Sequence, residues 1–302
     1  MNKLYKYLFV LSGFIFVLAL GLYFSGNVSL AGTPLILFFF TLALSMRGNK
    51  NLKGFSFTVL IFAAVSLSMF YPQSFIQLGD FQLKKLIVPL LQIIMFGMGT
   101  AMSFNDFYGV IKMPKGVLVG LICQFSIMPF LGFSLATIFN FPSEIAAGVV
   151  LIGSSPSGLA SNVMAYLAKA NIALSVTLTA VATIVSPLMT PLLMKYFAGA
   201  FVPIDFVAMM LSIVKMVILP VFLGLVFNHF FQGKAKWLDN AMPILSMTAI
   251  ALIIMIITAA GRDSLLSIGI LLILAAIIHN LLGYLLGYWS CRVLKMKEHD
   301  CR

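Results

Sequence analysis

The residues best suited to chemistry lie in one stretch, from Gly148 to Thr179. This stretch contains the run Gly153-Ser-Ser-Pro-Ser-Gly-Leu-Ala-Ser-Asn162, in which small hydroxyl side chains surround a proline in an apolar setting. Proline lacks a backbone N–H and glycine favours non-helical backbone, so a helix entering here should unwind at Pro156 and restart near Gly158. We therefore predict a broken membrane helix whose released polar groups line a site.

The restarted half-helix suits an anion. Its free N–H groups and the positive end of its dipole point toward the break, where a carboxylate would be stabilised. The residues expected to bind this anionic substrate are Ser157, Gly158, Leu159 and Ala160.

Hydroxyl and amide groups around the same break suit a cation. Side-chain oxygens come from Ser161, Asn162, Ser175 and Thr179, and Gln124 adds an amide oxygen from an adjoining helix. With the released carbonyls they could form a cage for a dehydrated hard cation. Because these oxygens are uncharged, the cage suits a monovalent ion better than a divalent one.

The alternative is that these small and hydroxyl residues only allow close helix packing, with Ser and Thr bonding to their own helix. Three features coincide against that alternative: the Pro/Gly break, the adjacent Ser161-Asn162 pair, and the i, i+4 pair of Ser175 and Thr179 on the next helix. Their coincidence favours a binding site.

The composition predicts that the elements positioning this site lie in a membrane. Of the 302 residues, 62% are hydrophobic and 9% are charged, and the mean hydropathy is +1.10. Such a chain needs lipid as its solvent. Apolar runs long enough to cross a bilayer predict an all-α polytopic protein with ten spans, at 4–24, 31–46, 54–72, 86–104, 115–138, 142–167, 171–197, 205–229, 239–260 and 265–291.

The net charge of +11 predicts an orientation rather than a nucleic-acid partner. The basic residues lie between the apolar runs and form no dense stripe. They concentrate in alternate gaps, which places both termini in the cytoplasm of a multi-pass inner-membrane protein. These residues are Lys3, Lys6, Arg47, Lys50, Lys53, Lys112, Lys115, Lys169, Lys234, Lys236, Arg292, Lys295, Lys297 and Arg302.

An enzyme is not expected. The eight acidic residues lie in or near loops, and the sequence has no carboxylate pair, no His-rich cluster and no nucleophile beside a base. The three cysteines lack metal-like spacing and are interpreted as free thiols. We therefore expect no cofactor and infer no obligate protein partner.

A weak internal repeat suggests the domain plan. The segments 124–133 and 279–288 both end in Leu-Gly-aromatic within long helices. If they correspond, a five-helix unit occurs twice with inverted topology, as in secondary transporters. The predicted division is two extra N-terminal helices at 1–52, a first repeat at 53–197 and an incomplete, three-helix second repeat at 198–302.

From about Lys53 onward the chain resembles the bile acid:sodium symporter family, specifically its bacterial members. The resemblance is carried by Ile93-Ile-Met-Phe-Gly-Met-Gly99, Gln124-Phe-Ser-Ile-Met-Pro129, Gly158-Leu-Ala-Ser-Asn-Val-Met-Ala-Tyr-Leu-Ala168, Asn171-Ile-Ala-Leu-Ser-Val176, Ser212-Ile-Val-Lys-Met-Val217 and His279-Asn-Leu-Leu-Gly-Tyr284. It implies two inverted repeats, a panel domain, and a core domain in which broken helices cross. It also implies that sodium ions drive the uptake of an organic anion such as a bile acid, a pantoate-like compound or another carboxylate.

The resemblance places the family's first sodium site at Ser161, Asn162, Ser175 and Thr179, and a glutamine of the second site at Gln124. Leu159 stands where bacterial relatives often have Thr, and the family's last two helices, with an acidic ligand, are absent. We interpret the sequence as a truncated record of a longer symporter working by alternating access. The alternative is a membrane sensor or scaffold that kept the fold, or an inactive fragment.

Overall fold

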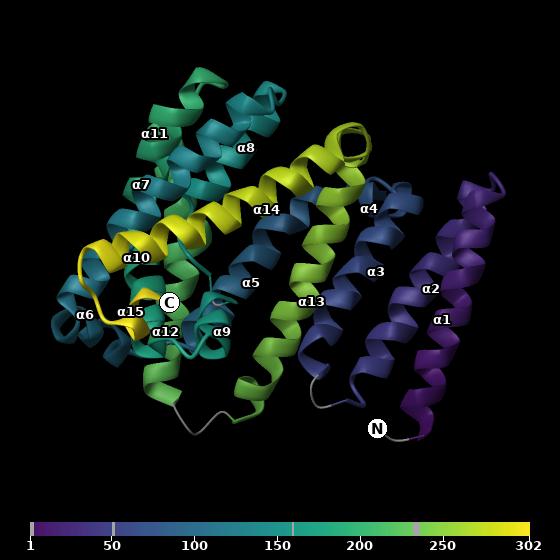
Figure 1. Ribbon diagram of the computed structural model, residues 1–302, viewed down its shortest axis with the longest axis horizontal. Coiled ribbons are helices and arrows are strands. Elements are labelled where there is room, and N and C mark those ends of the chain that lie inside the picture. Colours follow the sequence, from purple (N-terminus) through teal and green to yellow (C-terminus); the bar gives the residue numbers. More distant parts are fainter. Residues whose placement is uncertain (1–2, 50–51, 159, 232–235) are drawn as a thin grey trace. The chain divides into compact units, whose positions relative to one another are not determined.

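The computed structural model describes residues 3–49, 52–158, 160–231 and 236–302, and this part of the chain is almost entirely helical (Figure 1). Its one sheet pairs β1 (Gln77–Leu78) with β2 (Phe81–Gln82) in antiparallel register. Within the described residues, nine helical segments are long and apolar enough to cross a membrane. The predicted all-α polytopic membrane fold is confirmed.

Packing divides the chain into two units, and the first comprises Met1–Ile94 and Asn240–Ser267. Its helices α1, α2 and α3 pack in chain order (Figure 1), and small residues allow the close approach: Gly32 of α2 contacts the ring of Phe70 on α3. The unit holds α1 (Lys3–Phe24), α2 (Val28–Met46), η1 (Lys53–Phe55), α3 (Ser56–Phe70), α4 (Gln73–Ile76), the two strands, η2 (Leu83–Leu86), the first part of α5 (Ile87–Thr100) and most of α13 (Lys236–Ala260).

The second unit comprises Met95–Asp239 and Ile268–Arg302 and carries the predicted site. It holds η3 (Phe104–Tyr108), α6 (Gly109–Lys112), α7 (Pro114–Ile138), α8 (Ser143–Ser154), α9 (Ala160–Leu167), α10 (Ile172–Phe197), η4 (Ala198–Ala200), α11 (Phe206–Ile213), the π-helical turn η5 (Val214–Ile218), α12 (Leu219–Phe231), most of α14 (Arg262–Val293) and α15 (Glu298–Cys301). These units are defined by packing, so the repeat boundaries predicted at residues 52 and 197 stay a prediction.

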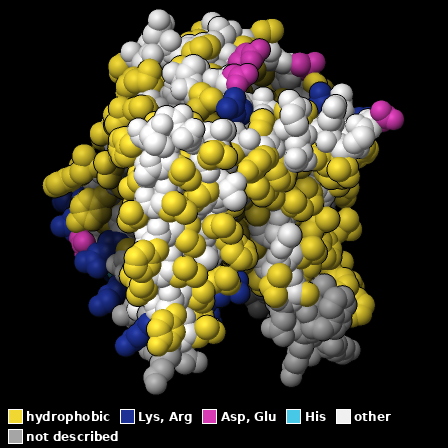
Figure 2. All heavy atoms as spheres, turned by 90° about the vertical axis from the view of Figure 1, so that its right-hand side faces the viewer, with side chains coloured by type: hydrophobic (Ala, Val, Ile, Leu, Met, Phe, Trp, Pro, Cys, Tyr) yellow, Lys and Arg dark blue, Asp and Glu magenta, His cyan; other side chains and the backbone are white. Residues whose placement is uncertain are grey.

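The span predicted at 142–167 is the one that the structure divides into two helices, α8 and α9. The other predicted spans correspond to continuous helical segments, among them the segment at Phe206–Phe231 that contains the π-helical turn. Side chains exposed on these helices are largely hydrophobic, as Figure 2 shows for one face, and contact with lipid accounts for this.

Helices α7 and α8 run side by side at very close range (Figure 1). A Cβ atom on Gly132 would lie 2.9 Å from the carbonyl oxygen of Val149, and one on Gly153 would collide with the carbonyl oxygen of Met128. Only glycine permits such an approach of backbone to backbone. The approach brings the end of α8 against the middle of α7, where Gln124 lies.

Candidate functional site

The predicted break is present. Helix α8 ends at Ser154, Ser155 has extended backbone with φ −83° and ψ 152°, and α9 begins at Ala160. The prediction of unwinding at Pro156 is thus confirmed, and the helix restarts two residues after the predicted Gly158. Leu159, one of the residues expected to bind the anion, lies outside the described residues.

The carbonyl groups released at the end of α8 bond to neighbouring helices. The Ser154 carbonyl accepts a hydrogen bond of 2.7 Å from Thr190 Oγ1 on α10, and the Ser155 carbonyl accepts one of 2.9 Å from Gln124 Nε2 on α7. A helix end in an apolar setting needs such partners. Gln124 therefore lies at the break, as predicted, and its amide nitrogen donates to the backbone.

The four residues expected to hold a cation are brought together by α9 and α10. Asn162 Oδ1 accepts a 2.7 Å hydrogen bond from Ser175 Oγ. Ser161 Oγ lies 3.3 Å from Thr179 Oγ1, and Thr179 is only 2% exposed. Residues from both sides of the link between α9 and α10 thus form one cluster of oxygens.

Ser157 joins this cluster. Its Oγ lies 3.3 Å from Thr179 Oγ1, so a residue expected on the anion side of the break also contributes an oxygen to the cation side. Gly158 has nothing within 4 Å of the place where a Cβ would stand, which leaves open space beside the start of α9. Ala160 is the first residue of α9, as its predicted role requires.

The chemistry of the cluster is that of neutral oxygens. Ser157, Ser161, Asn162, Ser175 and Thr179 carry no charge, and among the described residues no three His, Cys, Asp or Glu side chains converge on a possible metal position. Hydroxyl and amide oxygens suit a monovalent hard cation, whereas a divalent ion usually takes carboxylates.

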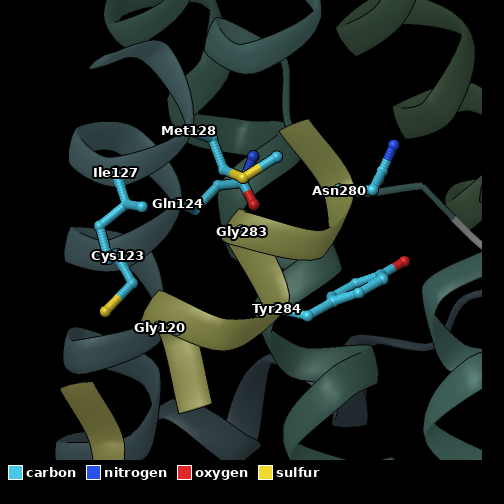
Figure 3. Close-up of a pocket in the computed structure, with 9 residues that line it drawn as sticks. Gly120, Cys123, Gln124, Ile127, Met128, Asn280, Gly283 and Tyr284 are labelled. Atoms are coloured by element: carbon cyan, nitrogen blue, oxygen red, sulfur yellow. The ribbon is translucent and has the colours of Figure 1, made fainter. Parts of the chain in front are cut away.

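A cavity of about 200 Å³ lies between α7 and α14 beside Gln124. In Figure 3, Gln124 and Met128 lie beside Gly283, while Asn280 and Tyr284 extend from the other side of α14. His279 is 3% exposed, and its Nε2 lies 2.9 Å from the Met128 carbonyl oxygen. This hydrogen bond joins α14 to α7. We therefore interpret His279 as a structural residue rather than as a group that transfers protons.

Two supporting residues were missed in the sequence. Thr190 holds the Ser154 carbonyl but stands in an ordinary apolar run, which gives no signal. Asn171 caps α10, because its Oδ1 accepts a 3.1 Å hydrogen bond from the Leu174 N–H. An asparagine directly before an apolar helix is a recognisable capping signal.

The chain is similar to known sodium-dependent transporters. The model of the sodium bile acid symporter family matches residues 88–268. The chain is 38% identical over 244 residues to the uncharacterized sodium-dependent transporter YocS of Bacillus subtilis, covering 81% of this chain and 74% of that protein. It is 33% identical over 232 residues to the human ileal sodium/bile acid cotransporter, covering 73% of this chain and 64% of that one.

A plant relative shows the same similarity over a smaller share of its length. The chain is 33% identical over 204 residues to the probable sodium/metabolite cotransporter BASS1, chloroplastic, of Arabidopsis thaliana, covering 68% of this chain and 51% of that protein. The chain thus spans between about half and three quarters of the length of these relatives.

Proposed function

Because the chain belongs to the sodium bile acid symporter family, we propose that it carries a small organic anion across the cytoplasmic membrane, driven by sodium. The family and the relatives are transporters rather than enzymes. The observation that carries the proposal is the oxygen cluster of Asn162, Ser175, Ser161 and Thr179 beside a broken helix.

Sodium is the proposed coupling ion. The hydroxyl and amide oxygens at the break are neutral and closely spaced, and Thr179 is buried at 2% exposed while the other cluster residues are half-buried. A bound monovalent ion would replace the present contacts between these oxygens and would join α9 to α10. Gln124 would contribute through its amide oxygen, since its Nε2 already bonds to the Ser155 carbonyl.

The proposed substrate is a carboxylate that docks at the start of α9. The open space at Gly158 leaves room for it, and the positive end of the α9 dipole favours an anion there. Ser157 would contact both ligands, because its hydroxyl also touches Thr179. A shared contact of this kind makes the affinity for each ligand depend on the other, and linkage makes that dependence reciprocal.

Transport would proceed by alternating access. Sodium first stabilises the break, the anion docks beside it, and the part of the molecule that carries the break then moves. Unpaired polar backbone in lipid costs several kcal/mol per group, so the break must stay covered by protein or by water throughout. In this arrangement both described ends of the chain face the cytoplasm, as the charge pattern predicts.

Uptake measurements test the proposal. Cells that express the complete reading frame containing these 302 residues are supplied with labelled pantoate, pyruvate or a bile acid, in sodium chloride or in choline chloride of equal concentration. We expect uptake of at least one anion in sodium and only background uptake in choline. Equal uptake in both salts would refute sodium coupling. Sodium binding without uptake of any of these anions would favour a non-transporting sensor.

A further inference from the structure

The segment that follows α14, residues 294–302 and here called the clamp segment, is held against the link between α9 and α10 (Figure 1). The Asn171 N–H donates a 2.9 Å hydrogen bond to the His299 carbonyl, and Asn171 Nδ2 donates one of 2.7 Å to Asp300 Oδ1. Only 25% of the Asp300 side chain is exposed. One asparagine is thus bound by the clamp segment through both its backbone and its side chain.

Further bonds fix the clamp segment in place. Lys115 Nζ on α7 donates a 2.8 Å hydrogen bond to the Leu294 carbonyl, and Arg302 reaches the Ala168 carbonyl at 3.4 Å. Cys301 is 7% exposed. The segment is therefore hydrogen-bonded to neighbouring helices at both of its ends, and Cys301 is buried.

Glu298 organises the middle of the clamp segment. Its carboxylate accepts a 3.0 Å hydrogen bond from the Tyr288 hydroxyl and forms ion pairs with Arg292 at 3.3 Å and Arg302 at 3.2 Å. The hydrogen bonds from Tyr288 and Arg302 hold the pKa of this carboxyl below its usual range. Glu298 is therefore charged at neutral pH, and the ion pairs are in place under ordinary conditions.

Asn171 connects the clamp segment to the proposed ion site. Its carbonyl accepts a 3.0 Å hydrogen bond from the backbone N–H of Ser175, and its Oδ1 accepts the Leu174 N–H. These bonds fix the first turn of α10, where Ser175 supplies one of the proposed ligand oxygens. The link between the two helices begins at the end of α9. There Lys169 has φ +54°, and the Ala170 N–H donates a hydrogen bond to the Ala165 carbonyl, which together terminate the helix.

We propose that Asn171 is a positioning residue for the ion site, and that its bond to Asp300 of the clamp segment sets the sodium affinity of that site. This inference rests on the proposed function. The carboxylate of Asp300 lies near the positive end of α10, which further favours the bonded arrangement. Sodium would then bind to a pair of helices already held at the right spacing.

The test exchanges the amide and the carboxylate of the bond between Asn171 and Asp300, first on one residue and then on both. In the variant Asn171→Asp the cap on α10 is retained, because aspartate caps helices as well as asparagine does. However, its carboxylate would face the carboxylate of Asp300 and repel it. Adding Asp300→Asn restores a hydrogen bond with donor and acceptor exchanged. Asn140→Asp is the matched control, because Asn140 is exposed in a loop after α7 with φ +49°, which aspartate tolerates.

The measurement is the melting temperature of the purified protein as sodium chloride replaces choline chloride at constant total salt. A bound ion raises the melting temperature by an amount that grows as ln(1 + [Na⁺]/Kd), so a fit of melting temperature against sodium concentration gives Kd without any substrate. This Kd is here called the midpoint, because the site is half occupied at that sodium concentration. We expect this midpoint to rise about tenfold in Asn171→Asp, the size of one charge-assisted hydrogen bond. In the double variant it should return to within about twofold of the wild type.

The outcomes separate this inference from the proposed function. If the melting temperature of the wild type showed no sodium-specific rise, the ion site would be refuted, and the proposed role of Asn171 would be refuted as well. A wild type that responds normally, with the same midpoint in Asn171→Asp, would overturn the positioning role alone. If Asn171→Asp melted at a lower temperature in choline but kept the wild-type midpoint, Asn171 would stabilise the fold without affecting sodium affinity. That result would also overturn the positioning role.

Discussion

Replacing Asn162 by alanine should reduce sodium-driven anion uptake to the rate measured in choline. The change removes the oxygen that now accepts the 2.7 Å bond from Ser175, and with it one proposed ligand of the ion. The other proposed ligands from α9 and α10, Ser161, Ser175 and Thr179, are hydroxyls, so the ion would lose the amide oxygen that α9 supplies. Uptake of labelled anion in sodium and in choline measures the effect.

The fold should survive the Asn162→Ala change. Freed from its partner, the Ser175 hydroxyl can turn to a carbonyl of its own helix, as serines in membrane helices commonly do. We therefore expect a normal melting temperature in choline and the loss of its rise in sodium. The control is Asn27→Ala, because Asn27 is exposed before α2 with φ −87° and its side chain makes no cap bond, so this variant should transport like the wild type. Full sodium-driven uptake by Asn162→Ala would exclude this residue from the ion site.

The largest loss of stability is expected from Gly153→Val. A Cβ at this position would collide with the Met128 carbonyl oxygen and would lie 2.8 Å from the Met128 carbonyl carbon and 3.1 Å from the Pro129 nitrogen. These are backbone atoms of a long helix, so they cannot rotate away as a side chain can. We expect a destabilisation of about 3 kcal/mol or more, the upper range for overpacked interiors.

Gly148→Ala is the matched control, because Gly148 lies on the same helix and has nothing within 4 Å of its Cβ position. Alanine favours helix over glycine by about 1 kcal/mol, so this variant should melt at or above the wild-type temperature. Melting of the purified variants in choline provides the comparison. If Gly153→Val melted like Gly148→Ala, the close approach of α7 and α8 would be wrong.

The break could be predicted from the sequence because its cause is local. Pro156 removes a donor and excludes regular helix wherever it stands inside a span, and the surrounding serines and glycines mark the loss of apolar character. The residues of the oxygen cluster could be predicted for a similar reason. Ser161 and Asn162 directly follow the break, and Ser175 and Thr179 share one face of the next helix.

The supports of the site could not be predicted, because they join distant residues. Thr190 and Ser154 are separated by 36 positions, and Asn171 and Asp300 by 129. Nothing in the local composition distinguishes Thr190 from the other hydroxyl residues of α10. The close approach at Gly153 is equally hidden, since a glycine beside a proline motif indicates flexible backbone as readily as tight packing.

The bond from Thr190 to the Ser154 carbonyl limits how the molecule can move. Sliding α8 along α10 by one turn would leave that carbonyl bare in an apolar interior, and the Gln124 bond to Ser155 would break with it. Helices α7, α8 and α10 should therefore travel together as one rigid piece during a transport cycle. In the proposed alternating-access cycle, the pathway would then open at the borders of this piece, while the interior of the piece stays unchanged.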